Sequence, residues 1–392
     1  MKDEESLDAG GDKLANCLTS LGHICSDINQ GAISAILPFL VVAYGYDYAS
    51  VAMVVFASNV VSAVIQPLFG IIGDKRPCPW FMALGVFLAG LGMTLIGFVG
   101  NYWLILASAV LSGVGVAMFH PEGGRLSNLA AGARKANGMS IFAVGGNVGF
   151  FVGPLLTAVF LSAFGMKGTL VFVFPATACA LVLLTFNRRF KALGVASAAR
   201  RDAPGGKEHW GRFVGVMGIL GGRSIIEYGM LAFIPLFIMG VMEQSQAVSS
   251  ATLSFFAICC AAATFLSGRV SERVGTHKLM IACLALTALM LCMFAFNRSF
   301  IAAVLLVGLL AVATALFYPS TVALGMSYVP RHIGTASGLS YGVVVAVGGI
   351  AEPFLGMAGD AVGLIPAMLI LAAISLLSML GGVALLAIDR RD

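Results

Sequence analysis

The sequence has very little charge. Only 10% of its 392 residues are Asp, Glu, Lys or Arg, against about 25% in a typical soluble domain. It also lacks a Cys-x-x-Cys pair and a nucleotide-binding glycine loop, and its eight cysteines are scattered. These absences argue against a soluble protein, a disulfide framework, a metal centre and an enzyme, and they predict no cofactor. The sequence contains no stretch that resembles an ion-selectivity filter, so nothing in it favours a channel.

Apolar residues dominate the chain instead. They make up 59% of the sequence and fall in runs of about 20 residues, the length needed to cross a bilayer. We therefore predict an all-α membrane protein with twelve transmembrane helices, near residues 17–43, 50–72, 80–99, 102–127, 137–161, 168–187, 213–240, 247–268, 277–296, 300–329, 335–358 and 364–388.

The distribution of basic residues predicts the orientation of these spans. Of the 23 Lys and Arg residues, 20 fall in the two tails or near the loops after every second span, which leaves only Lys167, Arg223 and Arg298 elsewhere. Because basic loops stay on the cytoplasmic side, both termini are predicted to be cytoplasmic. The same bias explains the net charge of +5, so we expect no nucleic-acid partner.

An internal repeat divides the chain into two halves. At a shift of about 198 residues, four features recur in the same order: Pro38 and Pro235, Gly70 and Gly268, Phe119-His120-Pro121 and Phe317-Tyr318-Pro319, and Pro154 and Pro353. The repeat predicts two pseudo-symmetric six-helix bundles, residues 1–187 and 213–392, around a site near the middle of the membrane. Residues 188–212, which include Pro204-Gly205-Gly206, are predicted to form a flexible cytoplasmic linker.

Motifs at the joints of this repeat resemble those of the major facilitator superfamily. Its signature after the second and eighth spans is Gly-x-x-x-Asp/Glu-Arg/Lys-x-Gly followed by basic residues. The second copy here is close to that pattern, whereas the first has Pro77 in place of the second glycine. The resemblance implies the major facilitator fold and a cytoplasmic gate formed by Gly70, Asp74, Lys75, Gly268, Glu272 and Arg273.

A narrower resemblance covers most of the first half. The residues that carry it look like the fosmidomycin resistance protein family: Ser20-Leu21-Gly22-His23, Asp27, Gln30, Phe119-His120-Pro121-Glu122 and Val144-Gly145-Gly146-Asn147. That family consists of proton-driven drug exporters of bacterial inner membranes. The resemblance therefore implies this location, protons as a partner, and export. It implies no particular cargo, because members of the family can differ in what they carry.

A polar stripe runs along the first predicted span. Its members follow one another at spacings of three or four, which places them on one helical face: Ser20, His23, Asp27, Gln30 and Ser34. Ionisable groups are costly in lipid, so such a stripe should face water or protein. His23 and Asp27 are one turn apart and are candidates for proton coupling. A structural hydrogen bond between them is the alternative. Gln30 is a candidate for substrate binding.

The fourth predicted span brings two further ionisable groups. His120 and Glu122 flank Pro121, which should kink the helix. Both are candidates for proton coupling. Glu122 also lies three residues before Arg125, so the alternative is that these two side chains simply form an ion pair.

The seventh predicted span carries Arg223 and Glu227, one turn apart. Arg223 is the only arginine deep in a predicted span, and a guanidinium there suits bidentate capture of a phosphonate or carboxylate. Both residues are therefore candidates for substrate binding. The alternative is a buried ion pair that neutralises itself, and removal of either partner would then harm folding.

Three more polar residues are candidates for lining a substrate cavity. Asn147 lies in a glycine-rich fifth span whose glycines are accounted for by helix packing. Glu352 lies in the eleventh span beside Pro353, and Tyr318 occupies the position of His120 in the repeat. A hydrogen-bonded core position is the alternative for Tyr318.

These patterns predict a secondary active transporter. The leading hypothesis is export, by proton antiport, of a small anionic or amphipathic organic compound through alternating access. Proton symport that takes up an organic acid or nutrient is the alternative, because the motifs do not fix direction. The expected partners are a small-molecule substrate, protons and the lipid bilayer. The protein is expected to be a monomer, with no metal, cofactor or nucleic acid.

Overall fold

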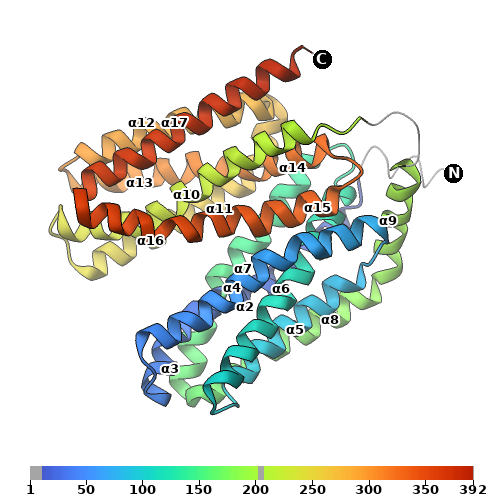
Figure 1. Ribbon diagram of the computed structural model, residues 1–392, viewed down its shortest axis with the longest axis horizontal. Coiled ribbons are helices and arrows are strands. Elements are labelled where there is room, and N and C mark those ends of the chain that lie inside the picture. The colour runs from blue at the N-terminus through green and yellow to red at the C-terminus, as the bar shows by residue number, and fades with distance from the viewer. Residues whose placement is uncertain (1–10, 202–206, 392) are drawn as a thin grey trace. The chain divides into compact units, whose positions relative to one another are not determined.

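The computed structural model describes residues 11–201 and 207–391, and helices make up nearly all of them (Figure 1). The chain forms two compact units, Met1–Glu208 with Val329–Val343, and His209–Tyr328 with Val344–Asp392. No strand occurs within the described ranges. The structure thus confirms the all-α prediction.

The first unit consists mainly of consecutive helices from the first half of the chain. They are α2 (Lys13–Ala35), α3 (Leu37–Tyr44), α4 (Tyr48–Lys75), α5 (Trp80–Ile96), α6 (Tyr102–Ala130), α7 (Lys135–Phe164), a 3₁₀ segment (Gly165–Phe172), α8 (Val173–Thr185) and α9 (Asn187–Arg201). A short piece from later in the chain completes the unit, namely α15 (Ile333–Gly338) and a π-helical turn (Leu339–Val343). That piece packs on α4 and α6.

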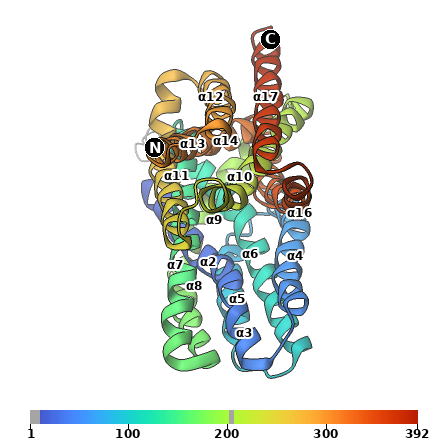
Figure 2. The same ribbon diagram turned by 90° about the vertical axis from the view of Figure 1, so that its left-hand side faces the viewer.

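The second unit is built from the remaining helices. They are α10 (Trp210–Gly240), α11 (Gln246–Val274), α12 (Thr276–Phe296), α13 (Phe300–Leu316), α14 (Tyr318–Tyr328), α16 (Val344–Val362) and α17 (Leu364–Asp389). Helix α17 packs on α12 and α10, and α11 packs on α13. The pair α12 and α17 lies side by side in two views (Figure 1 and Figure 2).

These helices account for the predicted spans. Nine helical stretches in the described ranges are long and apolar enough to cross a membrane, and the pair α2–α3, bent by 48°, makes a tenth. The stretch Lys135–Thr185 holds two spans, α7 and α8, and the apolar helix α5 supplies the last of the twelve. Large apolar side chains are exposed on the outside of the helices, such as Phe151 at 59% and Leu305 at 64%. Such exposure is stable in lipid and costly in water.

The segment predicted as a flexible linker differs from the expectation. Helix α9 covers Asn187–Arg201 and so includes more than half of residues 188–212. Eight of its 15 residues are Ala or Arg, which are strong helix formers, and it contains no proline. The Pro204-Gly205-Gly206 stretch on which the prediction rested lies outside the described residues.

In each unit an ion pair joins the start of the first helix to a later helix, α9 in the first unit and α17 in the second, and the polarity of the two pairs is opposite. In the first unit Asp12, before α2, accepts hydrogen bonds of 2.6 and 2.9 Å from the Arg189 guanidinium at the start of α9. In the second unit Arg212, at the start of α10, lies 3.1 Å from the Asp389 carboxylate at the end of α17. We call these the Asp12 and Asp389 clasps.

The Asp12 clasp predicts a pH-dependent contribution to stability. Burial would raise the pKa of the Asp12 carboxyl, but the hydrogen bonds and charge of Arg189, together with the backbone amides of Ala15 and Leu14, outweigh it and hold the pKa below its ordinary value. A lowered pKa stabilises the fold above the unfolded pKa, near 3.9, and this contribution disappears as the pH falls through the folded pKa.

Asp12→Asn should therefore lower the melting temperature by about 2–4 °C at pH 6, because Asn still caps α2 but cannot pair with Arg189. The difference from wild type should shrink as the pH falls below about 4. Thermal unfolding of both proteins in detergent, from pH 6 to pH 3, measures it. A difference that grows on acidification would contradict the assignment.

Candidate functional site

Two histidines and one aspartate meet inside the first unit. His23 and Asp27 lie one turn apart on α2, and His120 reaches them from α6. The Nε2 atom of His23 lies 3.2 Å from one carboxylate oxygen of Asp27, and the Nε2 atom of His120 lies 3.1 Å from the other. None of the three residues is more than 4% exposed. We call them the His–Asp–His triad.

The other ring nitrogen of each histidine is committed to the backbone. His23 Nδ1 lies 2.7 Å from the carbonyl oxygen of Phe142, and His120 Nδ1 lies 3.0 Å from that of Val116. A carbonyl oxygen only accepts hydrogen bonds, so each Nδ1 carries a hydrogen and donates it. Each Nε2 therefore presents a bare lone pair to Asp27 unless its ring gains a second proton.

The contacts with Asp27 become attractive only when protons are present. An imidazole lone pair and a carboxylate oxygen about 3 Å apart repel each other, whereas a proton on either partner makes the contact favourable. No other hydrogen-bond donor in the described part of the chain satisfies Asp27 Oδ1. The buried carboxylate thus depends on its two histidines, and the arrangement is suited to binding and releasing protons.

Aromatic side chains enclose the triad. The His23 ring stacks on Phe142 with the ring centroids 4.1 Å apart. The centroid of the Tyr341 ring, from the π-helical turn, lies 5.8 Å from the centroid of the His120 ring and 6.0 Å from that of the His23 ring. Tyr341 is thus the titratable side chain that approaches the triad from the short piece of the first unit.

Helix α7 approaches the triad so closely that only glycine fits. A Cβ atom at Gly146 would lie 2.8 Å from His23 Nε2 and 2.9 Å from the Asp27 carboxylate. The ligand atoms of His23, Asp27 and His120 also lie within 4.8 Å of one another, near enough to surround one metal ion. The sequence predicts no metal here, and that statement stays a prediction.

Glu122, the other acid of α6, has a different partner. Its carboxylate accepts hydrogen bonds of 2.8 and 2.7 Å from Nε and Nη2 of Arg125. The two side chains are 1% and 6% exposed. The structure therefore shows the ion pair that the sequence left open as an alternative, and it does not bring Glu122 into contact with the triad.

The first copy of the gating motif makes a buried contact. Asp74, at the end of α4, accepts 2.7 Å hydrogen bonds from the backbone amides of Gly334 and Thr335 and from the Thr335 hydroxyl. A Cβ atom at Gly70 would lie 2.3 Å from the Gly334 carbonyl oxygen, so α4 and α15 touch backbone to backbone. Because α15 belongs to the second half in chain order, Asp74 holds a piece of that half on the first bundle.

The second copy of the motif looks different. Gly268 is buried, but Glu272 and Arg273 are exposed, as is Lys75 of the first copy. The copy that departs more from the family signature thus makes the buried contact. The gating roles implied by the resemblance stay predictions.

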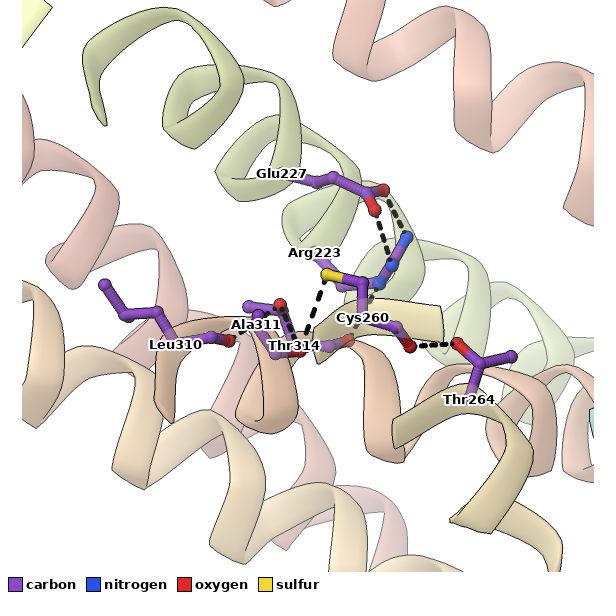
Figure 3. Close-up of polar contacts among 7 residues, drawn as sticks. All are labelled: Arg223, Glu227, Cys260, Thr264, Leu310, Ala311 and Thr314. Carbon is purple, nitrogen blue, oxygen red and sulfur yellow. Dashed lines mark hydrogen bonds and ion pairs between the residues drawn. The ribbon is translucent and has the colours of Figure 1, made fainter. Parts of the chain in front are cut away.

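Arg223 and Glu227 lie together in the second unit. Nη1 and Nη2 of Arg223 donate hydrogen bonds of 2.6 and 2.9 Å to the two carboxylate oxygens of Glu227, and Nε donates one of 3.0 Å to the Thr314 carbonyl oxygen (Figure 3). The guanidinium also lies over the Tyr318 ring, 4.2 Å from its centroid. Tyr318 is half-buried at this position.

The remaining substrate-binding candidates are spread over both units. Gln30 and Asn147 are half-buried on α2 and α7 of the first unit. Glu352 lies on α16 of the second unit, and its side chain is outside the described part of the structure. Their roles stay predictions.

Several partners of these candidates were not foreseen from the sequence. The sequence paired His23 with Asp27 but treated His120 separately, and it gave no role to Tyr341 or Thr314. The family-like His-Pro-Glu and Gly-Gly-Asn motifs were a usable signal, since the first supplies His120 of the triad and the second supplies Gly146, which packs against it. The backbone carbonyls that orient the histidines have no signature in the sequence.

Comparison with known proteins gives a consistent result. The chain matches the family model described as Major Facilitator Superfamily over residues 19–253 and 213–392. It is 29% identical over 369 residues to the uncharacterized MFS-type transporter YfnC of Bacillus subtilis (strain 168), which covers 91% of this chain and 89% of that protein. It is 28% identical over 372 residues to the fosmidomycin resistance protein of Escherichia coli (strain K12), which covers 92% of this chain and 90% of that protein.

A solved structure shares the fold. The crystal structure of the transporter FucP in the outward conformation matches with a TM-score of 0.75 and 14% sequence identity, covering 95% of this chain and 98% of that chain. At this identity the likeness concerns the fold alone. Together with the family match, it confirms the predicted fold class and the resemblance on which the prediction rested.

Proposed function

The chain belongs to the Major Facilitator Superfamily, a family of transporters rather than enzymes, and on that premise we propose that it exports a small anionic or amphipathic organic compound in exchange for protons. We propose a monomer that works by alternating access in a bacterial inner membrane. Both termini face the cytoplasm in this proposal, as the distribution of basic residues predicts.

The observation that supports proton coupling is the His–Asp–His triad. Both imidazoles donate Nδ1–H to backbone carbonyls, so their Nε2 atoms can contact Asp27 favourably only through added protons. Loss of these protons leaves a buried carboxylate between two lone pairs. The protonation state of the triad thus changes the free energy of packing α2 against α6 and α7. A ligand, here the proton, can drive a conformational change only if it binds the two conformations with different affinity.

Exchange requires that protons and substrate favour opposite steps. In the proposal, protons from outside neutralise the triad and stabilise the packing of α2 against α6 and α7. Their release to the cytoplasm removes that stabilisation and shifts the equilibrium to the other state. The contact of Asp74 with Gly334 and Thr335 forms and breaks with the gate. Glu122 stays a candidate for proton coupling, although its carboxylate forms an ion pair with Arg125 in the structure.

The experiment uses the purified full chain in proteoliposomes with an imposed pH gradient. The first compound is fosmidomycin, chosen because one relative is named a fosmidomycin resistance protein, followed by a panel of small organic acids. Antiport predicts accumulation inside vesicles whose lumen is acidic, since protons that leave are exchanged for substrate. An ionophore that collapses the gradient should abolish accumulation.

The opposite gradient tests the direction. Accumulation in vesicles with an alkaline lumen would show symport, which is the uptake hypothesis, and would overturn export. Equal accumulation under both gradients would show that transport is not coupled to protons at all. Protein-free vesicles with the same gradients correct for diffusion of weak acids.

A further inference from the structure

We propose that Glu227 is a built-in competitor of the substrate, which binds by replacing the Glu227 carboxylate on Arg223 with two oxygens of its own acidic group. The proposal deepens the export function and rests on it, since it names the chemical class that the second unit recognises. That class is an oxyanion with two oxygens in a carboxylate-like arrangement, either a carboxylate or a phosphonate.

Two groups besides Glu227 hold the Arg223 guanidinium in place. Its Nε–H is bonded to the Thr314 carbonyl on α13, and one face of the guanidinium lies on the Tyr318 ring. Its side chain is only 9% exposed. The guanidinium is thus oriented by groups that do not neutralise its charge, and such a rigid fork binds paired oxygens at a low cost in entropy.

One edge of this guanidinium matches a bidentate anion, and Glu227 occupies it. Nη1 and Nη2 donate to the two oxygens of the same carboxylate (Figure 3). Since Nε is committed to Thr314, a substrate oxyanion gains a comparable bidentate contact only after Glu227 leaves. Capture of the substrate is therefore an exchange of one anion for another.

Glu227 is the partner that can leave. Its side chain is 27% exposed, three times the exposure of Arg223. A carboxylate with access to solvent can regain hydration when it turns away, whereas a buried guanidinium that loses its partner cannot. The ion pair thus neutralises the charge of Arg223 while no substrate is bound. If both partners were fully buried, Glu227 would instead block the guanidinium permanently.

Binding measurements on purified protein in an uncharged detergent test the exchange. The probes are propylphosphonate and butyrate, with butyramide as the uncharged control, at fixed pH and ionic strength. The readout is the dissociation constant, together with the rise in melting temperature at saturating probe. No pH gradient is involved, so the outcome is independent of proton coupling.

Glu227→Gln should bind both anions at least about five-fold more tightly than wild type, because the competitor has lost its charge. Without anion this variant should melt below wild type, and each anion should restore its stability while butyramide does not. Arg223→Gln, alone or combined with Glu227→Gln, should bind neither anion. Glu243→Gln and Arg269→Gln, exposed positions of the same unit, are the matched controls and should behave as wild type.

Two results would overturn the proposal. One is a Glu227→Gln variant that melts early but is neither rescued nor bound more tightly by anions, which is the behaviour of a purely structural ion pair. The other is anion binding that survives Arg223→Gln. If the exchange is observed but vesicles show no accumulation under an acidic lumen, the export proposal fails while the substrate class stands.

Discussion

Asp27→Asn should remove transport driven by a pH gradient while the protein stays folded. Asparagine has nearly the volume of aspartate, so it fits the space beside Gly146, but its amide cannot take up or release a proton in the physiological range. Accumulation in vesicles with an acidic lumen should fall by about 5- to 150-fold, the usual range for loss of coupling between two ligands. Size-exclusion chromatography and thermal unfolding check the fold.

Two controls separate coupling from damage. Asp47→Asn makes the same chemical change at the N-cap of α4, where Asp47 accepts a hydrogen bond from the Ser50 amide. Asn caps a helix as well as Asp does, so accumulation should be unchanged. Exchange of labelled for unlabelled substrate without a gradient should persist in Asp27→Asn. If Asp27→Asn accumulates substrate like wild type, the triad has no part in coupling.

The second large effect concerns stability. Arg125→Gln leaves the Glu122 carboxylate, which is 1% exposed, without its bidentate partner. Removing one member of a buried ion pair costs about 3–5 kcal/mol, because an uncompensated charge stays in a medium of low dielectric constant. The free energy of unfolding, measured by denaturant titration in mixed micelles, should fall by that amount.

The double variant Glu122→Gln/Arg125→Gln decides what Glu122 does. Removing both charges should restore most of the lost stability, because neither buried charge is left alone. If the double variant is stable and still accumulates substrate under a pH gradient, the ion pair is structural. If it is stable but no longer coupled, Glu122 carries protons after all and the ion pair is one stage of its cycle.

Much of the fold could be predicted from the sequence because lipid imposes simple rules. Apolar runs of sufficient length must be spanning helices, and the twelve predicted spans correspond to helices in the structure. The linker was the main exception. Proline and glycine at positions 204–206 suggested flexibility for the whole of 188–212, whereas the helix-forming sequence before them folds as α9.

The site was predictable only where it is local. His23 and Asp27 are one helical turn apart, so their contact follows from helix geometry. His120 meets Asp27 from another helix, and Asp74 meets Gly334 across 260 residues of sequence. Such contacts depend on how helices pack, and no spacing in one sequence encodes them. The bond between His23 and the Phe142 carbonyl is less visible still, since any residue supplies a carbonyl.

The opposite polarity of the Asp12 and Asp389 clasps affects how a duplicated chain assembles during synthesis. Arg189 leaves the ribosome before Arg212, so the earlier half can close while the later half is still being made. If the final helix of the chain were to dock in place of the segment that holds Arg189, Asp389 would face Asp12, and the like charges would repel. The opposite signs of the two clasps therefore disfavour an exchange of closing segments between the duplicated halves.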